Sequence, residues 1–286
     1  MIPTKKRNHS AILVTEEGEN ILVDCGEGTQ RQFKAADLNP CKITRILISH
    51  WHGDHILGIP GLLQTLNLNN YSKTLQIYGP RGTKRHMESL ASMFLHGHEI
   101  KIEVHDVDEG KIIEEGPILI SAFRLDHGVP CLGYSIEQRT KVKMDVAKLK
   151  KLGLKGPIIG ELQRGKDVVF EGKKIKSKDV CHEEKGKKIS FVMDTRFHED
   201  IAKAVKDSDI LVCESTYIDD NKDKAEEYMH LTSSQAGEIA KKAGAERLYL
   251  THISQRYEMC EPKILKEAKK KFPKTVLAED LMRVEI

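Results

Sequence analysis

The sequence predicts an α/β fold, which three observations support. Short runs of β-branched and other apolar residues, typical of buried strands, recur at residues 43–48, 118–125, 189–193 and 247–250. Segments of helical character, such as residues 82–94 and 234–243, lie between or after such runs. Polar side chains follow the strand-like runs directly, at the position where α/β proteins carry their functional groups.

Further elements are indicated by turn residues. Residues 11–14 and 21–24 are predicted to pair as a hairpin, because β-branched runs flank a turn that contains Gly18. Residues 75–79 are a predicted strand that ends in a glycine-proline turn. With 286 residues, a net charge of +3, 39% hydrophobic and 31% charged residues, the chain is expected to form one large domain or two small ones.

Composition also excludes some classes of protein. No apolar run approaches the roughly 18 residues that a membrane span requires, and residues 1–7 lack a hydrophobic secretion core. We therefore expect a cytoplasmic protein that has no membrane partner. The six cysteines contain no C-x-x-C pair, which argues against a zinc ribbon or a disulfide scaffold and favours reduced thiols.

A dense group of metal-binding residue types follows the predicted strand at 43–48. Within six residues stand His50, His52, Asp54 and His55. A lone histidine is more often a core residue, but four such side chains together favour a metal site, and these nitrogen and oxygen donors suit zinc, with manganese or iron as alternatives. His50 and His52 point the same way in a turning backbone while the other two face a neighbouring point, so two adjacent ions could be bound.

This H-x-H-x-D-H cluster behind a hydrophobic strand resembles the signature of the metallo-β-lactamase superfamily. The resemblance implies a four-layer αββα sandwich over residues 1–286 and two Zn²⁺ per subunit, with Mn²⁺ possible. It places three further ligands at the ends of later predicted strands, namely His127, Asp194 and His252. One ion would be held by His50, His52 and His127, the other by Asp54, His55 and His252, with Asp194 between them. The resemblance also assigns Asp24 the role of supporting the ligands.

The loop Pro3-Thr4-Lys5-Lys6-Arg7-Asn8 narrows this resemblance. Such a charged loop is a solvated tip in most proteins. Within the superfamily it is similar to a loop of the ribonuclease Z family, the tRNA 3′-processing endonucleases, where it lies beside the tRNA 3′ end. The resemblance therefore implies that Lys5 and Arg7 bind substrate. Members of that family have a further edge strand ahead of this loop. In this chain, either that strand is absent or the start codon was placed late.

A basic stretch occupies the middle of the chain. Residues 139–188 hold 16 Lys or Arg and 7 Asp or Glu. Such a stretch can be a solvated face, or it can bind the phosphates of a nucleic acid. The Gly156-Pro157 pair, in a run of turn chemistry without regular periodicity, resembles the arm with which ribonuclease Z grips the tRNA body. The resemblance implies an inserted, flexible, basic tRNA-binding arm at residues 145–185, with Gly156 and Pro157 as substrate contacts.

Two polar residues in the last third complete the predicted site. Glu214 ends a predicted strand, and His230 precedes the helix at 234–243, where it could simply pack beside a helix cap. In ribonuclease Z a matching pair lies near the metals, and the histidine protonates the leaving 3′ oxygen. The segment Cys213-Glu214-Ser215-Thr216 departs from the usual His-Glu-Ala-Thr sequence of that family but keeps the glutamate. Asp54 would orient the attacking water or accept its proton, and Arg256 could bind a phosphate.

The function implied is a zinc-dependent endoribonuclease that cuts the 3′ trailer from precursor tRNA, leaving a 3′-hydroxyl on the tRNA and a 5′-phosphate on the trailer. A homodimer is implied as well. The alternatives are a small-substrate phosphodiesterase or arylsulfatase-like hydrolase of the same superfamily, and a metal-containing RNA-binding protein without catalysis. Four other histidines fit no ligand position and are expected to be surface or core residues: His86, His96, His98 and His105.

Overall fold

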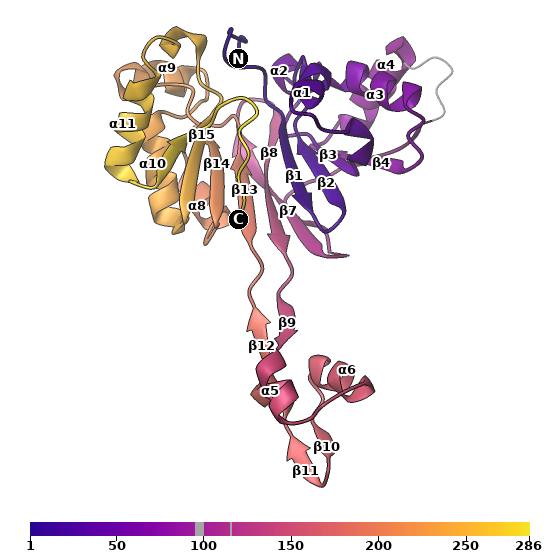
Figure 1. The fold of residues 1–286 in the computed structure, drawn as a ribbon. Helices are drawn as coiled ribbons and strands as arrows, with labels where there is room; N and C mark the ends of the chain where they lie inside the picture. The colour runs from indigo at the N-terminus through magenta and orange to yellow at the C-terminus, as the bar shows by residue number, and fades with distance from the viewer. Residues whose placement is uncertain (95–99, 115) are drawn as a thin grey trace. The chain divides into compact units, whose positions relative to one another are not determined.

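A mixed five-stranded sheet, with strand order β1-β2-β3-β4-β5, is built from the first part of the chain. The computed structural model describes residues 1–94, 100–114 and 116–286 (Figure 1). The first two strands pair antiparallel through a turn of Glu17 and Gly18, both at positive φ, which suits the twist of a hairpin. From β2 onward the strands pair in parallel. Their bounds are β1 (Ile12–Glu16), β2 (Glu19–Val23), β3 (Arg45–Leu47), β4 (Thr74–Gly79) and β5 (Lys101–Asp106).

Helices cover the outer face of this sheet. They are α1 (Thr29–Ala35), α2 (Gly53–Ile56), α3 (Ile59–Leu68) and α4 (Thr83–Phe94), with a 3₁₀ turn η1 (Pro40–Lys42). Leu62 and Leu66 of α3 lie one helical turn apart and are fully buried with Ile46 and Ile77 of the sheet. This apolar contact fixes the helix that follows the histidine cluster, and thereby the loop that carries the cluster.

The second sheet has seven strands in the order β16-β15-β14-β13-β8-β7-β6. Strands β13 to β16 are parallel, so their carboxyl ends meet at one edge. The bounds are β6 (Gly110–Ile113), β7 (Ile118–Asp126), β8 (Pro130–Gln138), β13 (Lys188–Val192), β14 (Ile210–Glu214), β15 (Arg247–Thr251) and β16 (Thr275–Leu277). Outside it lie α8 (Asp200–Ala204), η2 (Asp219–Asn221), α9 (Lys222–Glu227), α10 (Ser233–Ala243), η3 (Gln255–Tyr257) and α11 (Glu261–Lys271).

An apolar core joins the inner faces of the two sheets. Ile21, Leu47 and Tyr78 of the first sheet are buried in one cluster with Tyr134 and Phe191 of the second. Separate clusters lie between each sheet and its own helices. The order of layers is therefore helices, sheet, sheet, helices, and the expected αββα sandwich is confirmed (Figure 1).

Residues Glu137–Lys187 form a second compact unit, separate from the sandwich of residues 1–136 and 188–286. It has its own core of buried apolar side chains: Leu149, Leu154, Leu162, Val168, Ile175 and Val180. Its elements are two antiparallel strand pairs, β9 (Lys141–Met144) with β12 (Cys181–Glu184) and β10 (Val168–Phe170) with β11 (Lys173–Ile175), and the helices α5 (Val146–Lys151), α6 (Pro157–Gln163) and α7 (Ser177–Val180).

The helix α6 lies where turn chemistry without regular periodicity was expected. Gly156 precedes it with φ +71°, a conformation that favours glycine, and Pro157 occupies its first turn. The glycine and the proline thus begin a helix here. The segment expected as the arm, residues 145–185, lies within this second unit.

All six cysteines are free thiols. Across the ranges that the structure describes, no helix is both long enough and apolar enough to cross a bilayer.

Candidate metal centre

The seven predicted ligands lie together at the carboxyl ends of strands of both sheets. They follow β3, β7, β13 and β15, four segments that are far apart in the sequence. They form two groups, one of His50, His52, His127 and Asp194, the other of Asp54, His55, Asp194 and His252. Within each group, one ligand atom of every residue lies within 4.8 Å of the others, and Asp194 belongs to both groups.

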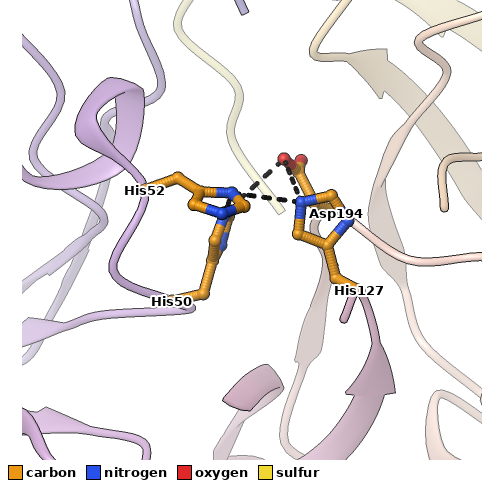
Figure 2. A group of neighbouring side chains, drawn as sticks. All are labelled: His50, His52, His127 and Asp194. Carbon is orange, nitrogen blue, oxygen red and sulfur yellow. Dashed lines mark hydrogen bonds and ion pairs between the residues drawn. The ribbon is translucent and has the colours of Figure 1, made fainter. Parts of the chain in front are cut away.

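The first group surrounds a single point (Figure 2). His50 Nε2 lies 3.0 Å and His127 Nε2 lies 3.2 Å from His52 Nδ1. The Asp194 Oδ2 atom is 3.6 Å from the Nε2 atoms of both His50 and His127. Four ligands about 2.0 Å from a tetrahedral zinc ion are separated by about 3.3 Å, so this spacing suits a cation. His52 is exposed, and the group is therefore open to solvent on that side.

The second group has similar spacing. His252 Nε2 lies 3.2 Å from Asp54 Oδ2 and 3.3 Å from His55 Nε2. His55 Nε2 lies 3.4 Å from Asp194 Oδ2 and 3.6 Å from Asp54 Oδ2. The amino group of Met1 also contacts Asp54 Oδ2. Two nitrogen and two carboxylate oxygen donors again match what divalent transition metals bind.

Hydrogen bonds from neighbouring residues orient the histidines. The buried Asp24 carboxylate accepts from His55 Nδ1 at 2.7 Å and from the Ser49 backbone N–H at 2.7 Å. His127 Nδ1 donates to the Met229 carbonyl at 2.9 Å. In both histidines the bonded Nδ1–H leaves the Nε2 lone pair facing the cluster, which is how proteins prepare a histidine to bind a metal.

The charges of the cluster also fit a cation. Asp194 is 2% exposed, and its Oδ1 atom has no hydrogen-bond partner. Burial opposes ionisation of this carboxyl, but His252 and His55 outweigh burial and lower its pKa well below the usual range. Burial lowers the pKa of His50 to about 2, so its imidazole is neutral and can bind a metal. A buried carboxylate with an unpaired oxygen, close to the neutral imidazole of His50, is an arrangement that a metal ion would satisfy.

Glu214 and His230 form a second polar pair beside the cluster. His230 Nδ1 lies 3.0 Å from Glu214 Oε1, and Glu214 is fully buried. The His230 ring lies 4.8 Å from the His127 ring and 5.4 Å from the His252 ring, between centroids. Burial disfavours the imidazolium, but the Glu214 carboxylate outweighs it and raises the pKa of His230 to about 9. The Glu214 carboxylate therefore favours the protonated form of His230.

Two threonines connect this pair to the cluster and one serine supports Asp24, and none of the three is a predicted site residue. The Thr195 backbone N–H donates to Glu214 Oε1 at 2.9 Å, and Thr195 directly follows Asp194. The Thr216 hydroxyl lies 2.6 Å from Glu214 Oε2. The Ser49 hydroxyl lies 2.9 Å from Asp24 Oδ2. In the sequence, each adjoins or stands two residues from a predicted site residue, and Thr216 also stands at the threonine of the family's His-Glu-Ala-Thr segment.

The predicted substrate contacts lie in different surroundings. Lys5 is exposed, whereas Arg7 Nε lies 2.6 Å from Glu261 Oε1 and Arg7 Nη1 donates to the Ala278 carbonyl at 2.6 Å. The exposed Arg256 guanidinium lies 5.1 Å from the centre of the Tyr217 ring. Gly156 and Pro157 belong to the second unit.

The histidines expected to bind no metal stay outside both ligand groups as far as they are described. His86 packs against Trp51 with ring centroids 4.8 Å apart, and His105 stacks on Tyr78 at 4.7 Å. His96 and His98 lie outside the described residues.

Comparisons with sequence families, curated proteins and solved structures all point to the same group of proteins. The sequence family described as the metallo-beta-lactamase superfamily matches residues 4–136, and the beta-lactamase superfamily domain matches residues 180–253. A curated protein named ribonuclease Z from Methanothermobacter thermautotrophicus is 40% identical over 100% of this chain and 93% of its own length. One of the same name from Chlamydia muridarum is 38% identical over 99% of this chain and 93% of its own. The crystal structure of human tRNase Z, short form, covers 100% of this chain and 95% of that chain, with a TM-score of 0.72 and 28% identity.

Proposed function

The chain belongs to the ribonuclease Z family of the metallo-β-lactamase superfamily, and we therefore propose that it is a metal-dependent endoribonuclease that removes the 3′ trailer of precursor tRNA. One observation carries the proposal: seven ligand side chains form two groups that share Asp194, beside the Glu214–His230 pair. Pairs of metal ions close together are a common device for cleaving phosphodiesters. The proposal includes two Zn²⁺ per subunit, with Mn²⁺ as an alternative.

We assign the steps to side chains of this chain as follows. Divalent cations held by the two groups would supply Lewis acidity toward the scissile phosphate and make a water acidic enough to attack at neutral pH. Asp54 orients that water or accepts its proton, since its carboxylate belongs to the second group. His230 donates its proton to the ribose 3′ oxygen as the bond between phosphorus and that oxygen breaks. Glu214 keeps His230 protonated and oriented. The products are a tRNA with a 3′-hydroxyl and a trailer with a 5′-phosphate.

The second unit supports tRNA as the substrate. Lysines and arginines outnumber acidic residues by 15 to 8 over residues 137–187 of this unit. Because such charges bind phosphates without regard to sequence, a basic unit suits the body of a tRNA, which varies in sequence but not in shape. Lys5, Arg7, Gly156, Pro157 and Arg256 are the proposed substrate contacts. A cytoplasmic homodimer completes the proposal, and light scattering of the purified protein would measure the subunit number.

The direct test is to incubate the pure protein, with its metal content measured, with a 3′-extended precursor tRNA and to map both product ends. We expect one main cut near the end of the acceptor stem, a 3′-hydroxyl on the tRNA and a 5′-phosphate on the trailer. Chelation should abolish the cut, and Zn²⁺ should restore it. Hydrolysis of bis-p-nitrophenyl phosphate without cleavage of the precursor would favour the small-substrate hydrolase. Binding that leaves the RNA intact after long incubation would favour an RNA-binding protein.

The role of the second unit can be tested by excising residues 145–180. Met144 and Cys181 are paired across the β9/β12 ladder, so a short glycine-serine turn can join them. The excision removes ten Lys or Arg and five Asp or Glu. We expect kcat/KM for precursor tRNA to fall at least roughly tenfold at low salt and to depend less on salt concentration. Hydrolysis of bis-p-nitrophenyl phosphate should not change.

A charge-matched pair of variants controls for the deletion. Changing Lys148, Lys150 and Lys151 of α5 to glutamine should reproduce part of the loss. The same change at the end of α11, at Lys269, Lys270 and Lys271, removes equal charge outside the unit and should have little effect. If precursor cleavage survives the excision unchanged, the tRNA-binding role of the unit is wrong.

A further inference from the structure

One buried hydroxyl lies where the Glu214–His230 pair meets the metal cluster. The Thr216 side chain follows β14 and is 6% exposed. Its Oγ1 atom is 2.6 Å from Glu214 Oε2, 2.9 Å from His252 Nδ1 and 3.3 Å from His230 Nδ1. The His252 carbonyl oxygen also lies 2.9 Å away. The Thr216 hydroxyl thus contacts both residues of the Glu214–His230 pair and a ligand of the second group.

The chemistry of a hydroxyl decides which of these contacts it makes. It has one proton to donate and two lone pairs to accept with. The shortest contact is to a carboxylate oxygen, which can only accept, so Thr216 donates to Glu214. His230 Nδ1 is closer to Glu214 Oε1, at 3.0 Å, and donates there. The lone pairs of the hydroxyl are then left to accept from His252 Nδ1.

A competing acceptor for that proton is Asp194. Its Oδ1 atom lies 3.3 Å from His252 Nδ1, which is longer than the 2.9 Å to Thr216, and it forms no hydrogen bond. The proton of His252 therefore sits on Nδ1 and points at Thr216. The Nε2 lone pair is left facing Asp54 and His55, at 3.2 and 3.3 Å. A proton on the other nitrogen would block metal binding at this histidine.

We propose that Thr216 is a positioning residue: it fixes His252 in the form that binds the second cation and holds Glu214 in place at the same time. The inference rests on the two-cation centre proposed above. It predicts unequal effects on the two cations. In the first group, His127 Nδ1 donates to the Met229 carbonyl, and this hydrogen bond does not involve Thr216. In the second group, removal of the Thr216 hydroxyl takes away the hydrogen-bond partner of His252 Nδ1.

The test is a Zn²⁺ titration of the metal-free, full-length protein by calorimetry. Thr216→Val removes the hydroxyl at nearly constant volume, and Thr216→Ser keeps it. Thr275→Val is the matched control, because Thr275 lies in β16, away from the cluster, is 2% exposed, and donates its hydroxyl to the carbonyl of Phe272, which directly follows α11. We expect two binding events in the wild type, with the second weakened roughly 10–100-fold in Thr216→Val and restored in Thr216→Ser. Thr275→Val should bind as the wild type does.

The outcomes separate this inference from the function on which it rests. A wild type that binds fewer than two Zn²⁺ contradicts the proposed centre itself. Two Zn²⁺ in the wild type with unchanged affinities in Thr216→Val overturn the positioning role alone. Should Thr216→Val lack a cooperative thermal transition, Thr216→Ala and Thr216→Ser decide instead. Equal Zn²⁺ affinities at the second site in those two variants would then overturn the positioning role. A weakened second site in Thr216→Ala but not in Thr216→Ser would support it.

Discussion

Replacing Asp194 with asparagine is expected to abolish tight binding of both cations and, with it, cleavage of precursor tRNA. Asp194 Oδ2 lies within 3.6 Å of nitrogens from His50, His55 and His127, so the carboxylate faces both groups. Asparagine keeps the size of the side chain but removes the negative charge that balances two cations. Since residues that merely orient a ligand change metal affinity by 10–100-fold, loss of the shared ligand should exceed roughly 100-fold at both sites.

Metal content after dialysis, together with the rate of precursor cleavage, measures this effect. Asp108→Asn is the control, because Asp108 is an exposed carboxylate that pairs with Arg124 outside the cluster. The control should retain wild-type metal content and activity. If Asp194→Asn keeps two tightly bound Zn²⁺, Asp194 does not bridge the cations, and the two groups must be redefined.

The strands that carry the ligands could be predicted from local sequence, but their meeting point could not. A buried strand needs a run of apolar, often β-branched residues regardless of which strands it pairs with. The runs before His50, His127 and Asp194 can therefore be recognised in the sequence. Convergence depends on sheet order and register, such as the pairing of Glu214 with Thr251, and no local spacing encodes these. The resemblance to a known family supplied that information.

The β3 strand illustrates a difference between burial and pairing. The apolar run at residues 43–48 predicts a strand of that length, but β3 covers only Arg45–Leu47. Ile43 and Ile48 are nevertheless almost fully buried, at 1% and 0% exposure. An apolar run reports which residues are removed from water, and the ends of the strand depend on hydrogen-bond partners that the sequence does not reveal.

Polar contacts were the least predictable feature. Thr216, Thr195 and Ser49 are ordinary loop residues by type, and only the fold brings their hydrogen-bonding groups to Glu214 and Asp24. Arg7, predicted to bind substrate, pairs with Glu261, which lies 254 residues later in the chain. Long-range polar contacts follow from tertiary structure, and the pattern of charges along the sequence does not predict them.

Replacing His230 with alanine is expected to lower kcat for precursor tRNA by about 10²–10⁴-fold, the usual contribution of a general acid. The ribose 3′ oxygen is a poor leaving group unless it is protonated. Nitrophenolate leaves without a proton, so hydrolysis of bis-p-nitrophenyl phosphate by His230→Ala should change little. Metal content should equal that of the wild type. Equal losses on both substrates would contradict the role of His230 as a proton donor.

The pH dependence tests the same role through Glu214. The pKa of His230 is raised to about 9 because the Glu214 carboxylate outweighs the effect of burial, so the acid form is present at neutral pH and disappears as pH rises through that value. Glu214→Gln keeps the burial but removes the charge, and the alkaline limb of kcat for precursor tRNA should therefore shift to lower pH. The limb for bis-p-nitrophenyl phosphate should stay where it is, because that reaction needs no acid. A common shift for both substrates would assign the limb to the metal centre.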